Sequence, residues 1–237
     1  KIPISEWIEY LLHLFEFHSI NSTAYDNRNS PTTGKYWLIK TFEVLKGIQN
    51  DVVLDGTVYL DETYFTKVRS KLVTKDGKKL RGISRNKIGV GVACNETKSI
   101  FIVTGTSKPS RKSTKETYSQ HIARGSVLVH DDEHSHSILI EELELESIVY
   151  PTAETKELSD KDNPLYPVNN LHLLLKQFIR NHGAYDREHL QDWLNLFWFI
   201  MNEPKDKYDK VLKFIEMAVL SPKKVRYRDA MSSKHSK

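Results

Sequence analysis

Cysteine is almost absent from this chain, since Cys94 is the only one among 237 residues. A single cysteine excludes a disulfide framework and any zinc site built from cysteines, and it favours a reducing compartment. Long apolar runs are also missing: no stretch approaches the roughly 18 residues needed to span a bilayer, and the N-terminal segment lacks the pattern of a signal peptide. These absences predict a soluble, cytoplasmic protein that makes no use of a membrane.

Basic residues are present in only small excess, with a net charge of +4, but they are strongly clustered. Between residues 67 and 87, nine basic residues face one acid, which gives a local charge of +8. They are Lys67, Arg69, Lys71, Lys75, Lys78, Lys79, Arg81, Arg85 and Lys87. A second cluster contains Lys108, Arg111, Lys112 and Lys115. A third contains Lys223, Lys224, Arg226 and Arg228. Any one cluster is as readily a solvated loop, but three together favour a nucleic-acid partner.

The first part of the chain has helical periodicity. Apolar residues recur at helical spacing over residues 4–20 and again over 32–47, with a short helical turn near Ser22 between them. This order predicts a helix-turn-helix-like segment, with Thr33 and Lys35 as candidate DNA contacts at the start of the last helix. A three-helix packing that does not touch DNA has the same spacing, so that alternative stays open.

From residue 57 the periodicity becomes that of strands. We expect strands over residues 57–63, 87–94 and 99–104, a helix over 113–123, a strand ending at Asp131, a helix over 137–143 and a strand over 147–150. Three more helices are expected after these strands, over residues 168–181, 187–201 and 208–220. The chain then ends in a basic tail that we expect to lack fixed structure. Three antiparallel strands followed by alternating helix and strand predict an α/β protein with an RNase H-like mixed sheet flanked by helices. The expected domains are 1–50 (helical, DNA-binding), 51–202 (catalytic) and 203–237 (C-terminal helix and tail).

Three polar sites fall at informative places in this order. Asp61 lies in the first strand and Asp131 ends the fourth, which in this fold is its neighbour in the sheet. Because successive strand residues point to opposite faces, only one of Asp61 and Glu62 can line the site, and we choose Asp61. On the helix expected over 168–181, the residues Asn169, His172 and Lys176 share one face. Carboxylates with a further polar ligand predict a site that holds divalent metals against phosphodiester oxygens.

Several motifs surround these sites. They are Asp61-Glu62-Thr63-Tyr64, Arg81-Gly82-Ile83-Ser84-Arg85, His130-Asp131 with Glu133 and His136, and Pro167-Val168-Asn169-Asn170-Leu171-His172 with Lys176, followed by Gly183 and the run Leu190, Trp193, Leu194 and Phe197. Over about residues 1–202 the chain thereby resembles insertion-sequence transposases of the DDE superfamily. The last motif, the most specific one, is similar to the ISXO-like branch, which uses Asp-Asp-Asn-Lys in place of Asp-Asp-Glu.

The resemblance implies a transposase that cuts at element ends and transfers strands into target DNA. It implies an RNase H-like catalytic domain with two Mg²⁺ ions, which Mn²⁺ can replace, held by Asp61, Asp131 and Asn169, with Lys176 on DNA or phosphate. Double-stranded DNA, as terminal inverted repeats and target, is then the partner, bound by a homodimer or larger assembly in the bacterial nucleoid. The expected DNA contacts are Lys78, Lys79, Arg81, Arg85, Arg111, Lys112, His172, Lys176, Thr33 and Lys35.

Alternatives remain at this stage. Asp132 stands where the resemblance leads us to expect glycine, so either Asp131 or Asp132 is the second ligand. His130, Asp131, His134 and His136 are acceptable zinc donors and form a rival metal site. Because Asn169 is neutral and binds magnesium more weakly than a glutamate would, a domesticated DNA-binding protein without cleavage is one alternative function. A metal-dependent nuclease without strand transfer is the other.

Overall fold

The computed structural model describes residues 3–66, 76–77, 82–83, 86–183, 187–202, 204–221 and 223–232. The chain forms two compact units, Gln49–Leu175 and Lys1–Ile48 with Lys176–Lys237. The domain boundaries expected after residues 50 and 202 stay a prediction, because they concern function as well as compactness. In the described part of the chain, no helix combines the length and the apolar character needed to cross a membrane.

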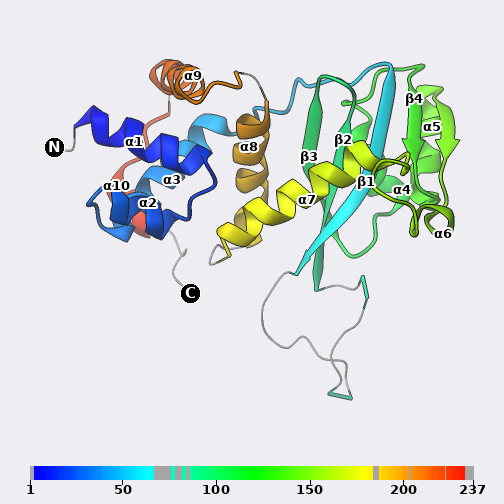
Figure 1. Ribbon diagram of the computed structural model, residues 1–237, viewed down its shortest axis with the longest axis horizontal. Helices are drawn as coiled ribbons and strands as arrows, with labels where there is room; N and C mark the ends of the chain where they lie inside the picture. The colour runs from blue at the N-terminus through cyan, green and yellow to red at the C-terminus, as the bar shows by residue number, and fades with distance from the viewer. Residues whose placement is uncertain are drawn as a thin grey trace. The chain divides into compact units, whose positions relative to one another are not determined.

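The unit Gln49–Leu175 is built on a five-stranded mixed sheet (Figure 1). Its strands are β1 Thr57–Thr66, β2 Lys87–Cys94, β3 Ser99–Thr106, β4 Val127–His130 and β5 Glu146–Val149, in the order β3-β2-β1-β4-β5. The pairs β1–β2 and β2–β3 are antiparallel, whereas β1–β4 and β4–β5 are parallel. This order and these directions are those of the RNase H-like fold, so the predicted fold class is confirmed.

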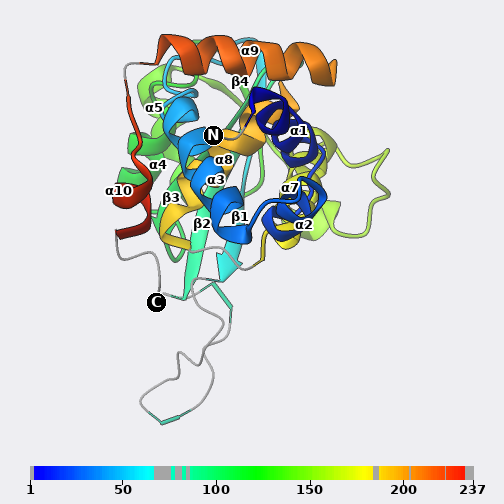
Figure 2. The ribbon, with the colours of Figure 1, turned by 90° about the vertical axis from the view of Figure 1, so that its left-hand side faces the viewer.

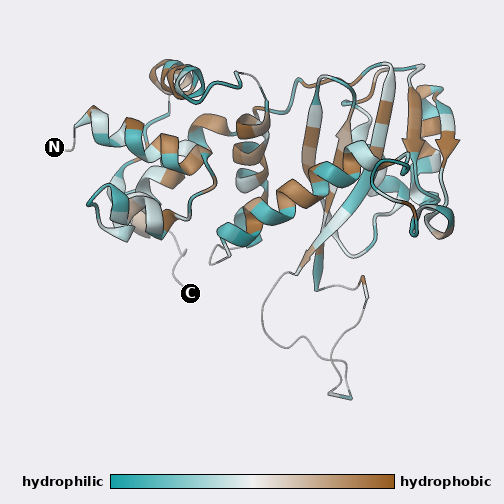
Figure 3. Cartoon of the chain, viewed as in Figure 1, coloured by the Kyte–Doolittle hydropathy of each residue, from teal (hydrophilic) through white to brown (hydrophobic). Residues whose placement is uncertain are grey.

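Helices of this unit cover the sheet. They are α4 Arg111–Tyr118, the 3-10 turn η1 His134–His136, α5 Ser137–Leu143, the short α6 Thr152–Thr155 and the first part of α7 Tyr166–Asn181. Leu60 of β1 belongs to the same buried apolar cluster as Tyr118 of α4 and Leu139 of α5. The helices α4 and α5 therefore cover the sheet face that carries Leu60. Hydrophilic and hydrophobic bands alternate along α7 (Figure 3), as expected for a helix that buries only one side.

The second unit is helical (Figure 2). It contains α1 Ile4–Phe15, α2 Ile20–Asp26, α3 Pro31–Leu45, the 3-10 turn η2 Arg187–His189, α8 Leu190–Met201, α9 Lys207–Leu220 and α10 Tyr227–Ser232. Aromatic rings fill its core: Trp7 packs on Trp37 and Phe214, and Phe42 packs on Trp193. Because α8 buries residues on nearly every side, including Trp193 and Phe197, it is the helix around which this unit is packed.

Two elements of the helical unit differ from the sequence prediction. The helix expected over 4–20 ends at Phe15, because Phe17 adopts a left-handed backbone with φ of 67° and turns the chain into α2. The tail expected to lack fixed structure contains α10, where the Tyr227 ring packs edge-on against Tyr36. The Tyr36 hydroxyl also donates to the carbonyl of Val225 at 2.8 Å. Tertiary contacts therefore decide both elements.

Candidate functional site

Asp61 lies in β1, and Asp131 directly follows β4, the parallel neighbour of β1. In the parallel pair β1–β4, Leu60 is in register with His130, and each aspartate is the next residue of its chain. The two aspartates thus follow directly from a pair of residues that face each other across the sheet, and the charge of Asp131 contributes to the raised pKa of Asp61. The structure thus brings together the two acids that the sequence analysis selected.

Glu62 points to the opposite face and is buried there. Its Oε1 accepts a hydrogen bond of 2.9 Å from the hydroxyl of Tyr118 on α4. Tyr118 reaches it across Gly91, the residue paired with Glu62 in β2, where an added Cβ would lie 2.1 Å from the hydroxyl oxygen. A glycine is therefore required at position 91 for Tyr118 to bond Glu62.

His136 connects Glu62 with the other carboxylate. Its Nε2 lies 3.3 Å from both oxygens of Glu62, and its Nδ1 lies 3.9 Å from Asp131 Oδ1 and 3.1 Å from Nδ1 of His130. His130 Nε2 in turn lies 3.0 Å from Ser147 Oγ. This buried chain of hydrogen bonds lies on the sheet face that carries Glu62 and supports the segment around Asp131.

The carboxylates of the site repel one another. Burial, followed by the charges of Asp131 and Glu62, raises the pKa of Asp61 to about 7. Burial also raises the pKa of Asp131, against the opposing effects of the hydrogen bond from the Glu133 backbone and the charge of His136. Burial lowers the pKa of His136, but its hydrogen bond to Glu62 and the nearby acids outweigh this effect, so the net shift is upward. A cation bound between Asp61 and Asp131 would relieve this repulsion.

The helix α7 approaches the site on the face of Asp61. Nδ1 of His172 lies 3.7 Å from Asp61 Oδ2, and His172 is 6% exposed. Asn169 precedes it by three residues on the same helix and is half-buried, so it lies on the same side. Lys176 lies further along α7, in the helical unit. The contact of His172 with Asp61 is observed, whereas its contact with DNA and the roles of Asn169 and Lys176 stay predictions.

Asp132 has a different environment from Asp131. Its side chain is exposed, and its Oδ1 accepts from the Thr152 hydroxyl at 3.4 Å. Asp131 is held instead by the Glu133 backbone N–H, which donates to its Oδ1 at 3.0 Å. Since the charge of Asp131 also raises the pKa of Asp61, we prefer Asp131 to Asp132 as the second ligand, and this choice stays a prediction.

The rival zinc site is present in part. Ligand atoms of His130, Asp131 and His136 lie within 4.8 Å of one another, whereas the exposed His134 is not in the group. Both nitrogens of His130 and His136 already have protein partners, in the chain from Ser147 to Glu62. These hydrogen bonds engage all four ring nitrogens of His130 and His136 without a metal.

The predicted DNA contacts are placed only in part. Lys78, Lys79, Arg81 and Arg85 lie outside the described residues. Arg111 pairs with Glu141 at 2.6 Å and Lys112 with Glu116 at 3.8 Å, but exposed pairs of this kind are weak and exchange readily for phosphates. At the start of α3, the Ser30 side chain caps the helix by accepting from the Thr33 backbone N–H, and Lys35 is exposed. The DNA-binding roles of all these residues stay predictions.

The donor set at Asp61 and Asp131 fits a hard divalent cation. Two partly buried carboxylates converge there, and charged and amide oxygens are the ligands that Mg²⁺ prefers. Sequence reasoning did not identify Glu62 and Tyr118 as parts of this site. One signal for this contact was present in the sequence, the alternation of glycine with branched residues in β2, because a glycine in a strand often marks a place where another group comes close to the backbone.

Comparison with known proteins leaves the family open. No protein-family model and no curated protein matches the chain. Among solved structures, the chain is similar to a Mos1 strand transfer complex, with 14% identity, a TM-score of 0.38, and coverage of 97% of this chain and 77% of that one. It is also similar to the Mos1 transposase catalytic domain with Raltegravir and Mn, with 13% identity, a TM-score of 0.37, and coverage of 81% and 92%. Likeness at this level carries no argument about function.

Proposed function

We propose that this chain is a DNA transposase of the DDE type, which cuts DNA at the ends of a mobile element and joins those ends to a target. The observation that carries the proposal is the pair Asp61 and Asp131, set side by side by the β1–β4 register with the pKa of Asp61 raised to about 7. A partly buried pair of acids with α7 against it matches a site that holds metal ions on phosphodiester oxygens. The motifs around Asp61, Asp131 and Asn169 add the resemblance to this class of enzyme.

Asp61, Asp131 and Asn169 would hold the metal in this proposal. Two Mg²⁺ ions held by these residues, or Mn²⁺ in their place, would supply Lewis acidity to the phosphate and would lower the pKa of the attacking water or hydroxyl. His172 keeps the Asp61 carboxylate in position from α7. Glu62 and His136 do the same for Asp131 from the opposite face, and Lys176 holds a neighbouring phosphate. These residues orient the reacting groups rather than form a bond with them.

The chemistry needs no covalent enzyme intermediate. In the first step the oxygen of water bonds to phosphorus at the element end, and the bond from phosphorus to the 3′ oxygen of the element breaks. The freed 3′ hydroxyl then loses its proton and attacks a target phosphate, and the 3′ oxygen of the target leaves. Each step exchanges one phosphorus–oxygen bond for another, so no oxidant, reductant or energy-rich cofactor is consumed.

DNA would be held mainly by the basic segments. Lys78, Lys79, Arg81 and Arg85 would bind phosphates, as would Arg111 and Lys112 once they leave their exposed acidic partners. Thr33 and Lys35 would contact DNA at the start of α3. Because two element ends must meet before transfer, we propose a homodimer or a larger assembly on DNA.

A strand-transfer assay tests this proposal. The full chain is incubated with pre-nicked ends of its own element, a supercoiled plasmid and Mg²⁺, and joined product is measured on a gel. We expect product with the wild-type chain, none with Asp61→Asn or Asp131→Asn, and a normal yield with Asp132→Asn. Asp55→Asn is the matched control, because Asp55 is exposed and its carboxylate accepts a hydrogen bond of 3.0 Å from the side chain of Asn95, away from the acids of the site.

The alternative functions give different results in the same assay. Cleavage without joined product would indicate a metal-dependent nuclease, and DNA binding without either product would indicate a domesticated binding protein. Loss of joining in Asp132→Asn, with activity retained in Asp131→Asn, would mean that the second ligand is Asp132.

A further inference from the structure

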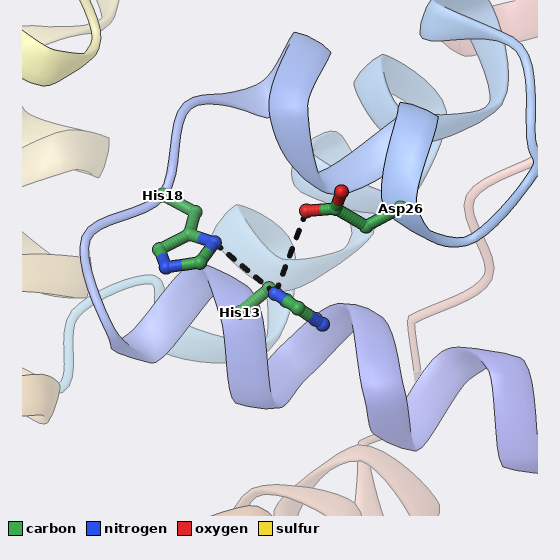
Figure 4. Close-up of side chains that lie close together, drawn as sticks. All are labelled: His13, His18 and Asp26. Carbon is green, nitrogen blue, oxygen red and sulfur yellow. Dashed lines mark hydrogen bonds and ion pairs between the residues drawn. The ribbon is translucent and has the colours of Figure 1, made fainter.

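A second group of potential metal ligands lies in the helical unit, apart from the acids on the sheet. Ligand atoms of His13, His18 and Asp26 lie within 4.8 Å of one another (Figure 4). Nδ1 of His13 is the shared atom, 3.1 Å from Nδ1 of His18 and 3.8 Å from Asp26 Oδ2. All three residues belong to the compact unit formed by the two ends of the chain.

The local backbone brings these residues together. His13 is in the last turn of α1, and Asp26 is the last residue of α2. Between them, Phe17 adopts its left-handed conformation, and the His18 N–H donates back to the His13 carbonyl at 3.1 Å. The Phe17 ring is held by Phe178, with centroids 5.0 Å apart. Ring packing therefore helps to hold the unfavourable left-handed backbone of Phe17. The chain turns at this residue, and His18 then lies against His13.

We propose that His13, His18 and Asp26 form a binding site for a divalent transition metal ion of the zinc class. Zinc takes imidazole nitrogens and carboxylate oxygens at about 2.0 to 2.2 Å in a tetrahedron, so two of its ligand atoms lie about 3.3 Å apart. The two separations from His13, 3.1 and 3.8 Å, bracket this value, and the third, between His18 and Asp26, is at most 4.8 Å. Three protein ligands leave the fourth position for water. The site is independent of the proposed strand-transfer function.

The two imidazoles also need an explanation for their close approach. Two nitrogens at 3.1 Å repel unless one carries a proton and donates it, or unless both lone pairs bind one cation. Asp26 places a carboxylate beside this pair, with side-chain exposures of 26% for His13 and 38% for Asp26. Water and ions therefore have access to this group, whereas His136 in the other histidine group is 0% exposed.

A metal at this position would fasten three consecutive segments. It would tie the end of α1, the turn at His18 and the end of α2 to one point. Because the ligands would meet only in the folded chain, metal binding would also stabilise that fold. The expected consequence is an α1–α2 arrangement that is more resistant to unfolding in the presence of the ion.

Direct binding measurements test the site. The full chain, freed of metal with a chelator, is titrated with Zn²⁺ against a competing indicator and with Co²⁺, whose visible absorption reports tetrahedral coordination. We expect one ion at this site and a rise in the thermal unfolding temperature. Since the loss of a group that only orients a ligand costs about 10- to 100-fold in affinity, His13→Gln, His18→Gln and Asp26→Asn should each weaken binding by more than about tenfold.

Two further variants make the result specific. His189→Gln is the matched control, since Nδ1 of His189 faces Asp192 Oδ2 at 3.2 Å in the same unit but neither residue belongs to a three-ligand group among the described residues. It should bind Zn²⁺ as the wild type does. Circular dichroism checks that every variant is folded. Unchanged affinity in His18→Gln and Asp26→Asn, or loss of the ion only in His136→Gln, would overturn the proposal.

Discussion

The imidazole Nε2 of His136 lies 3.3 Å from both carboxylate oxygens of Glu62, in a contact closed to solvent. Glu62 is the neighbour of Asp61 in β1, and the Nδ1 of the same His136 ring faces Asp131 at 3.9 Å. One buried pair therefore joins the two segments that carry the candidate metal ligands. Its energetic importance can be measured in several ways.

Removing the Glu62 side chain should destabilise the fold. In Glu62→Ala, the hydroxyl of Tyr118 and the ring of His136 lose a buried acceptor, and each unsatisfied buried group costs about 1 to 3 kcal/mol. We expect the free energy of unfolding to fall by about 2 to 5 kcal/mol in urea denaturation. Glu146→Ala, at an exposed position of β5, is the control and should change it by less than about 0.5 kcal/mol.

The position of Gly91 should be sensitive to a single methyl group. Gly91→Ala would place Cβ 2.1 Å from the Tyr118 hydroxyl oxygen, and the forced displacement should cost about 1 to 3 kcal/mol of stability. In a Tyr118→Phe background that oxygen is gone, so the cost of Gly91→Ala should be smaller. A double-mutant cycle in urea measures the difference. Additive costs would show that the hydroxyl of Tyr118 is not the group that limits the space at this glycine.

Asp61 should make the metal-free protein less stable as the pH rises. Its folded pKa of about 7 lies above its ordinary value, so ionisation is less favourable in the folded chain than in the unfolded one. The stability associated with this group is complete below about pH 4 and is lost as the pH rises through 7, by up to about 4 kcal/mol. Chelator-treated wild type and Asp61→Asn are compared by urea denaturation between pH 5 and 8, in steps of about half a unit. Equal pH dependence in the two proteins would contradict the assignment.

Substitutions of Asn169 and Lys176 on α7 should affect different properties, the joining reaction and DNA binding respectively. If the Asn169 amide is a metal ligand, Asn169→Ala should abolish joining at any Mg²⁺ concentration, whereas Asn169→Asp or Asn169→Glu should retain some. Lys176→Ala should chiefly weaken DNA binding. Yields of joined product over a Mg²⁺ titration and DNA affinities by fluorescence anisotropy separate the two effects. Full activity in Asn169→Ala would remove this residue from the ligand set.

The basic segment before β2 should determine much of the salt dependence of DNA binding. A variant with four alanines should bind DNA of every sequence more weakly; the replaced residues are Lys78, Lys79, Arg81 and Arg85. The slope of log affinity against log salt concentration should become shallower by roughly 3 to 4. The control replaces Lys46, Lys98, Lys156 and Lys161, which are exposed and lie outside the three basic clusters. A slope equal to that of the control would show that this segment is only a solvated surface.

Several elements could be predicted from the sequence because their causes are local. Alternation of branched residues with glycine marked β2 at Lys87–Cys94, and the helix over 137–143 coincides with α5. The period of two along β1 was enough to separate Asp61 from Glu62. The same kind of reasoning placed Asp131 after β4, and the order of strands and helices specified the RNase H-like sheet.

Other features depended on residues far apart in the chain. Glu62 and His136 are 74 positions apart, so no local pattern could indicate that a buried acid on the face away from Asp61 supports Asp131. The left-handed Phe17, just after α1, packs its ring on Phe178 and Phe197, which lie far away in the sequence, and these contacts help to hold its backbone. The sequence by itself determined most of the strands and helices, the position of Asp61 within β1 and that of Asp131 directly after β4. Only the tertiary structure decided which side chains share a buried environment, because burial, pKa and metal affinity depend on neighbours brought together by packing.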